Sequence, residues 1–282
     1  MTKRTRYTFS IFPLILFSTV VSAGDESRWF PVEHLYPAYL ADPYAFGFHL
    51  QLRSYDESTI PETGSLRWDG MVGAPLIIYE KKGSDNTDYG WQFIFMGGLR
   101  GQFDTENKHD NIAWEGLLGL QGVFRYHDNF AWHIGTKHYS SHIGDEYIER
   151  TGRTRIGYTR NELRAGFAWD FSEHYMFYSD IADAVALPDK TYQDNLRAQA
   201  GVQYEKPGVF LDGKAGWYSA LDISAYEEDD WDTNITFQTG FDLRSHDRRW
   251  RLGLEYYDGR SQYGEFFQYR DKYTSIGVMM DL

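Results

Sequence analysis

The sequence has no cysteine, and only 8 of its 282 residues are proline. The absence of cysteine excludes disulfides, thiol nucleophiles and cysteine-ligated metal sites. Basic residues are also few, with 28 lysines and arginines against 41 acidic residues, and the net charge of −13 argues against nucleic acid as a partner. Beyond the N-terminal region, no stretch supplies the roughly 18 apolar residues that a membrane-spanning helix needs.

The N-terminal residues are typical of a secretory signal peptide over residues 1–23. A basic start precedes an apolar run at about 9–21, and small residues suited to cleavage follow at 21–23. Residues 24–44 contain three prolines and are predicted to be a segment that lies in the periplasm or enters a barrel mouth. Residues 45–282 are predicted to form one domain.

Aromatic residues make up 18% of the chain, yet its mean hydropathy is polar, at −0.56. This combination is typical of a membrane barrel with a wet lumen, an apolar outer band and aromatic girdles. Composition alone also allows a large soluble β-protein.

Alternation of apolar and polar residues favours an all-β, transmembrane antiparallel barrel of about 12 strands. Short turns near 128, 172, 207–208 and 246–247 alternate with longer polar loops near 54–66, 143–156, 183–194, 221–232 and 258–272. This asymmetry is that of periplasmic turns and extracellular loops, and it predicts the outer membrane of a Gram-negative bacterium. The strands are expected at 45–53, 68–79, 90–103, 112–126, 130–142, 157–171, 174–182, 195–205, 209–219, 233–243, 250–257 and 273–282.

The strand at 130–142 carries the candidate site. Its outward face is apolar at first and then places His138, Ser140 and His142 near the outer rim, on the lipid side, where polar groups are costly. The hairpin to the next strand is expected to set Asn161 opposite His138 and Thr159 opposite Ser140. A serine needs a base to become nucleophilic and a histidine needs a third group to orient it, so Ser140, His138 and Asn161 are the predicted catalytic residues.

A His-x-Ser pair at the outer end of a barrel strand, with asparagine on the next strand, resembles outer membrane phospholipase A, a twelve-stranded barrel whose triad faces the bilayer. Lipid A 3-O-deacylases have a similar pair with a glutamate as third member. Residues 138–147, with Ala41-Asp42-Pro43 upstream, also resemble a bacterial outer-membrane family of unknown function with an H-x-S-S-H-x-G-D-E motif. The resemblance to the phospholipase implies outer-membrane lipids as substrates and calcium as a cofactor, for which Asp145 and Glu146 are the nearby candidates.

The chain departs from the phospholipase pattern, which continues from the serine into asparagine and glycine. Ser141 and His142 stand at these positions, and the loop before Asn161 is longer. The oxyanion hole is therefore not assigned, and His142 and the backbone of Gly144 are secondary candidates.

Three functions follow from these observations. The first is an outer-membrane acyl-ester hydrolase that acts on phospholipid or lipid A. The second is a channel, in which the histidines belong to an interfacial girdle and the lumen charges form an ion-pair network or line a pore. The third is a structural or adhesive barrel with an acidic partner loop at 226–232. The apolar last strand favours recognition by the barrel-assembly machinery, and a homodimer remains open.

Overall fold

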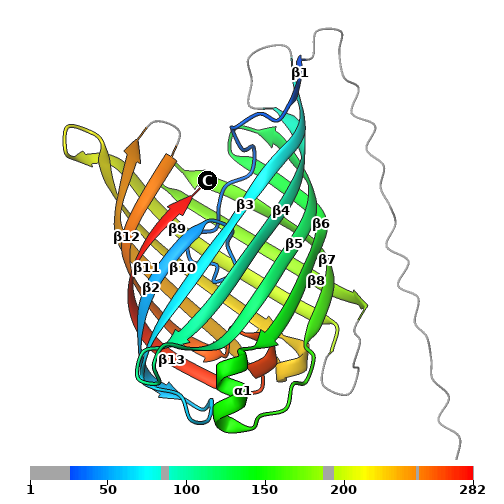
Figure 1. The fold of residues 1–282 in the computed structure, drawn as a ribbon. Helices are drawn as coiled ribbons and strands as arrows, with labels where there is room; N and C mark the ends of the chain where they lie inside the picture. The colour runs from blue at the N-terminus through cyan, green and yellow to red at the C-terminus, as the bar shows by residue number, and fades with distance from the viewer. Residues whose placement is uncertain (1–25, 84–88, 187–193, 246–247, 282) are drawn as a thin grey trace, which may run out of the picture.

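The computed structural model describes residues 26–83, 89–186, 194–245 and 248–281. Twelve antiparallel strands, β2 to β13, form a closed barrel in which each strand pairs with its sequence neighbours and β13 closes on β2, as the sequence predicts (Figure 1). No helix in the described ranges is long and apolar enough to cross a membrane. The elements are β1 (Glu26–Trp29), β2 (Phe48–Ser58), β3 (Leu66–Lys82), β4 (Gly90–Asp104), β5 (Asp110–His127), β6 (Phe130–Ile143), α1 (Asp145–Thr151), β7 (Thr159–Ser172), β8 (Tyr175–Ala186), β9 (Leu196–Phe210), β10 (Ala215–Tyr226), η1 (Glu227–Asp229), β11 (Thr233–Ser245), β12 (Arg248–Arg260), η2 (Gly264–Phe266) and β13 (Arg270–Asp281).

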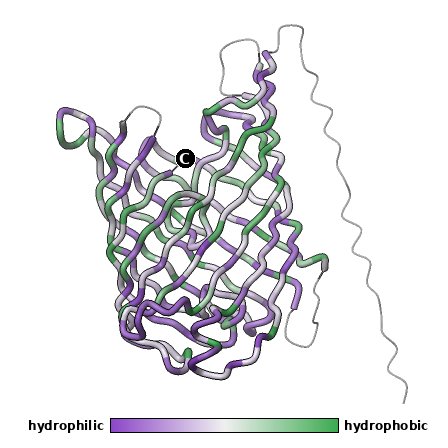
Figure 2. The backbone as a smooth tube through the Cα atoms, viewed as in Figure 1, coloured by the Kyte–Doolittle hydropathy of each residue, from purple (hydrophilic) through white to green (hydrophobic). Residues whose placement is uncertain are grey.

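The period-2 pattern of each strand separates the two faces of the barrel, and Figure 2 shows the alternation of green and purple along the strands. Large apolar side chains such as Leu99 and Leu254 are exposed on the outer face, while charged ones such as Arg100 and Glu255 are buried inside. This arrangement is the reverse of a water-soluble fold, and it suits a barrel whose outer face meets hydrocarbon.

Residues 35–46, in the segment between β1 and β2, lie inside the barrel, and we call them the plug (Figure 1). Leu35 and Leu40 are buried against the barrel wall, and the Tyr39 hydroxyl donates a hydrogen bond to Asp180 at 2.7 Å. These side chains bury apolar surface against the barrel wall and pair with lumen groups, which holds the segment within the barrel. The predicted signal peptide, residues 1–23, lies outside the described residues.

The hairpin between β9 and β10 turns later than the sequence predicts. A turn at 207–208 was expected, but β9 continues through Pro207 to Phe210, so β10 ends at Tyr226 and the loop after it is shorter. The pairing of β9 with β10 is irregular here, which accommodates a proline that cannot donate to the ladder. The turn is made by Leu211 and Asp212, both with positive φ. The predicted turn at 246–247 lies outside the described residues.

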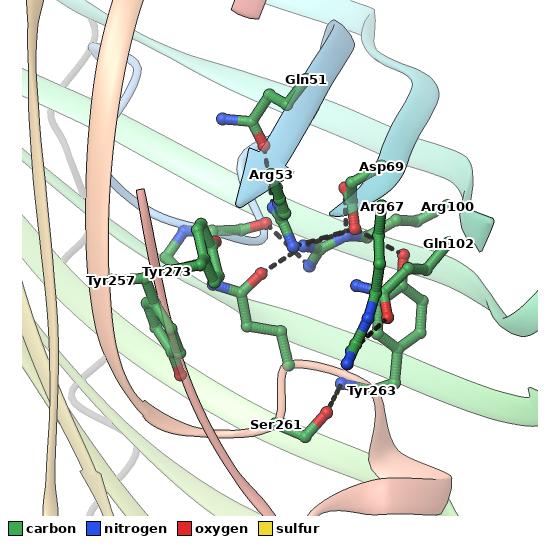
Figure 3. A network of polar contacts seen from close by, with 12 residues as sticks. Gln51, Arg53, Arg67, Asp69, Arg100, Gln102, Tyr257, Ser261, Tyr263 and Tyr273 are labelled. Atoms are coloured by element: carbon green, nitrogen blue, oxygen red, sulfur yellow. Dashed lines mark hydrogen bonds and ion pairs between the residues drawn. The ribbon is translucent and has the colours of Figure 1, made fainter. Parts of the chain in front are cut away.

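Many of the charges inside the barrel form ion pairs. Asp69 forms ion pairs with Arg53 at 2.9 Å and with Arg100 at 3.1 Å, and the Tyr263 hydroxyl donates a hydrogen bond to it at 2.8 Å (Figure 3). Arg160 pairs with Glu162 at 2.8 Å. The lumen therefore holds an ion-pair network, with the plug packed against it.

The loops cover the end of the barrel that lies at the bottom of Figure 1. Tyr147 of α1 packs against Ile60 and Phe266 in an apolar cluster, and its hydroxyl donates to the carbonyl of Pro61 at 2.6 Å. Burial raises the pKa of Tyr147. We call the cluster of Ile60, Tyr147 and Phe266 the cap, because it lies at the end of the barrel that the loops cover.

Candidate active site

The candidate residues lie on β6 and β7, which form a hairpin at the loop end of the barrel. His138, Ser140 and His142 alternate with buried residues and are half-buried on the outer face. The register sets His138 opposite Asn161 and Ser140 opposite Thr159, the neighbours that the hairpin predicts.

The side chains form two hydrogen-bonded pairs. His138 Nδ1 lies 2.7 Å from Asn161 Oδ1, and Ser140 Oγ lies 3.0 Å from His142 Nε2. The serine hydroxyl is therefore paired with His142 and not with His138. The ring of His142 stacks on Trp114 of β5, with 4.1 Å between centroids, which fixes its plane.

The contact with Asn161 sets the tautomer of His138. The oxygen of Asn161 only accepts, so Nδ1 of His138 must carry the proton and Nε2 keeps a lone pair. Side chains two apart on a strand are separated by about 6.7 Å, and Ser140 stands between the two imidazoles. Rotation of the serine about Cα–Cβ turns its hydroxyl from one histidine towards the other.

An open groove of about 770 Å³ on the outer face begins at these residues. It is lined on one side by His138, Ser140 and His142, and its other lining is apolar or glycine. These residues come from β2 to β5 and β13, with Gly47 just before β2: Gly47, Phe48, Val72, Gly73, Ala74, Gly97, Gly98, Leu99, Trp114, Gly116, Leu117, Leu118 and Met280.

Of the secondary candidates, His142 joins the site, whereas Gly144 and the two calcium candidates lie outside its hydrogen-bonded pairs. The N–H of Gly144 donates to the carbonyl of Ile112 at 2.9 Å, so it is not free to act as an oxyanion donor. Asp145 pairs with Arg155 at 3.0 Å, and Glu146 is exposed on α1. Among the described residues, Asp145 and Glu146 do not belong to any group of three or more His, Cys, Asp or Glu side chains that could hold a metal ion.

Two buried residues hold the hairpin in place. The carboxylate of Glu265 accepts hydrogen bonds from the backbone of Ile156 at 2.9 Å and Gly157 at 2.8 Å, just before β7. The N–H of Glu265 donates to Ser141 Oγ at 3.0 Å, on β6. Glu265 thus ties together both strands that carry the candidate site.

Sequence reasoning missed Glu265, Ser141 and the glycines of the groove. Glu265 gave no local signal, because its partners lie more than 100 residues away. Gly97 and Gly116 do interrupt the apolar alternation at lipid-facing positions. Gly101 and Gly122 interrupt it in the same strands but lie outside the groove, so this signal alone does not locate the groove.

A family model described as "Protein of unknown function (DUF1207)" matches residues 19–281 of the chain. No curated protein sequence matches it.

Solved barrels share the fold. Outer membrane phospholipase A from Escherichia coli is 9% identical, with a TM-score of 0.58, and the match covers 84% of this chain and 92% of that one. The phospholipase of Salmonella typhi, described as a dimer with bound calcium, is 10% identical, with a TM-score of 0.57 and coverage of 85% and 93%. LpxR from Salmonella typhimurium is 8% identical, with a TM-score of 0.44 and coverage of 84% and 100%. The barrel thus resembles those of Gram-negative outer-membrane proteins, and identities this low show the fold alone.

Proposed function

The chain belongs to the DUF1207 family, and from the geometry of its outer face we propose that it is an outer-membrane acyl-ester hydrolase. Its substrates would be lipids of the outer leaflet, phospholipid or lipid A, and Ser140 would be the nucleophile. One observation carries this proposal: a serine, two histidines and an asparagine form close pairs at 3.0 and 2.7 Å on a surface that faces lipid, beside an open groove. Four polar side chains in such a place are costly unless they have a function.

The proposed reaction uses His138 as the base. The Ser140 hydroxyl turns from His142 to Nε2 of His138, whose other nitrogen is held by Asn161. Ser140 Oγ attacks the ester carbonyl, and its proton passes to His138 and then to the departing alkoxide. Water then gives a proton to His138 and attacks the carbonyl of the acyl-serine. The bond to Ser140 Oγ breaks, His138 returns the proton to that oxygen, and the fatty acid is released. Asn161 orients the ring without adding a charge that lipid would have to desolvate.

His142 has a different role in this proposal. It holds the serine hydroxyl in the resting state, with its own ring fixed by Trp114. Replacing His138 should therefore cost roughly 100-fold or more in rate, the usual contribution of general base catalysis, and replacing His142 should cost less. If His142→Gln lowers the rate more than replacement of His138, His142 is the base, and Asn161 does not orient the catalytic ring.

The test uses purified barrel in vesicles of phospholipid and lipid A, with mass spectrometry of fatty acids and deacylated lipids. Ser140→Ala should lose roughly a thousandfold or more in rate, as expected for removal of a nucleophile. Thr136→Ala is the matched control, because Thr136 lies on the same strand and face, two residues before His138. Equal product from wild type and Ser140→Ala, with both folded, would refute the proposal.

No observation favours a channel to the same degree. The plug packs against the inner wall of the barrel, the cap lies at its loop end, and lumen charges such as those of Asp69 and Glu162 are paired with arginines. For the acidic loop 226–232, Glu228 makes inward ion pairs with Arg160 at 3.1 Å and Arg260 at 2.6 Å, which is a structural role. The barrel-assembly machinery as a partner and homodimer formation remain predictions.

A further inference from the structure

We propose that the groove beside Ser140 binds one long acyl chain of an outer-leaflet lipid and thereby selects long-chain esters. This inference rests on the proposed function, because it takes Ser140 as the point where the ester is held. It names the part of the lipid that the protein recognises, which the catalytic residues alone do not define.

The groove runs alongside one row of paired residues across the outer face. Ser140 of β6 lies opposite Gly116, which lies opposite Leu99, and the row continues through Val72 to Phe48. Every strand from β6 to β2 thus contributes to a path that crosses four strand intervals, about 19 Å in all.

The path also descends into the membrane. Ser140 lies three residues before the loop-side end of β6 at Ile143, whereas Phe48 lies ten residues from the loop-side end of β2 at Ser58. With strands tilted by 35–45°, a row of about 19 Å drops by about 11–14 Å. One leaflet of hydrocarbon is about 15 Å thick, so the groove spans the depth that one acyl chain occupies.

Small residues form the floor of the groove and large ones its walls. Gly116 and Gly97 leave the backbone bare, while Trp114, Leu99 and Leu118 stand out beside them. A Cβ added at Gly116 would meet no atom within 4 Å, so its missing side chain is not required by packing within the chain. Because Gly116 has no side chain, the end of the groove next to Ser140 is open.

The chemistry of the lining identifies the occupant. Apart from the polar side chains of His138, Ser140 and His142 at one end, every lining residue is apolar or glycine. An elongated apolar groove in a lipid-facing surface, with an ester-cleaving serine at its outer end, fits a hydrocarbon chain whose ester lies at that serine. A lipid whose scissile chain is short would fill only the first part of it.

The test compares hydrolysis of palmitoyl and butyryl glycerophospholipids in mixed micelles. Gly116→Leu fills the groove without an internal clash, and it should lower kcat/KM for the palmitoyl ester by tenfold or more relative to the butyryl ester. Gly122→Leu is the matched control, because Gly122 lies on the same strand and face, six residues away and outside the groove. A palmitoyl-to-butyryl ratio that Gly116→Leu leaves unchanged would overturn the inference while the hydrolase proposal stands.

A second measurement is independent of hydrolysis. A palmitoyl phospholipid with a diazirine near the chain end is bound to the Ser140→Ala barrel, irradiated, and the labelled peptides are mapped by mass spectrometry. Labels should concentrate at residues 72–74 and 97–99 and at Phe48, and Gly116→Leu but not Gly122→Leu should remove them. Labels spread evenly over the outer face would refute the groove even if the barrel hydrolysed lipids, and concentrated labels would support it even if no hydrolysis were found.

Discussion

Glu265 should control how firmly the loop before β7 is held. Its side chain is 1% exposed, and its two oxygens accept from Ile156 at 2.9 Å, Gly157 at 2.8 Å and Tyr158 at 3.3 Å. In Glu265→Gln one oxygen becomes an NH₂ group, which cannot accept. One of these hydrogen bonds is lost, and the new NH₂ group faces a buried backbone N–H, which is also a donor.

The expected cost is about 1–3 kcal/mol, the penalty for leaving a buried polar group unpaired. Because 1.4 kcal/mol is a factor of ten, the open form of the loop should become roughly 5- to 150-fold more populated. The segment carries Arg153 and Arg155, so trypsin reports on this opening. Cleavage follows the open population when opening and closing are fast relative to cutting.

The assay is the first-order rate of trypsin cleavage between residues 150 and 156 in the folded barrel, in detergent. Glu149→Gln is the control, because Glu149 is exposed on α1 and its carboxylate is not buried. If Glu265→Gln is cut no faster than the control, the carboxylate does not hold this loop and the reasoning fails.

Two other substitutions test the barrel interior and the end of β6. Asp69→Asn removes the charge that pairs with Arg53 and Arg100, so the free energy of unfolding should fall by about 3–5 kcal/mol, measured as urea unfolding followed by gel shift. The control, Asp56→Asn at an exposed position, should leave the free energy of unfolding almost unchanged. Equal urea midpoints for the two variants would contradict the pairing. Gly144→Ala would place a Cβ on the carbonyl oxygen of Asn111 and should prevent the barrel from reaching its heat-modifiable folded form. In the control Gly152→Ala the new Cβ meets no atom, but the residue has positive φ, so the free energy of unfolding should fall by only about 1 kcal/mol. A stable Gly144→Ala barrel would show that the turn can relax.

Much of the fold was accessible from the sequence because the side-chain period of a strand is two. Parity separates residues such as Phe93 and Gln92, or Leu99 and Arg100, onto opposite faces, and the alternation of short turns with long loops then predicts that the apolar face is the outer one. The same parity, with similar distances of the two residues from the loop that joins β6 and β7, predicted that His138 and Asn161 are cross-strand neighbours. The turn at 207–208 was wrong, because a proline and a glycine also fit an irregular strand end beyond the regular ladder.

The pairing of the catalytic candidates was not accessible in this way. Parity puts His138, Ser140 and His142 on one face, and Ser140 is equally spaced from both histidines along the strand. In the structure the Ser140 hydroxyl pairs with His142, whose ring is stacked on Trp114 of the neighbouring strand β5. The position of the plug was equally hidden, because Tyr39 and Asp180 are 141 residues apart.

The sequence by itself determined the number of strands, the outward face of each and the place of the polar cluster near one end, because these depend on local periodicity and loop length. Only the tertiary structure decided what fills the barrel, which histidine holds the serine, and that glycines from separate strands join into one groove. These features arise when the sheet closes, since closure brings together side chains whose separation along the chain leaves no local pattern.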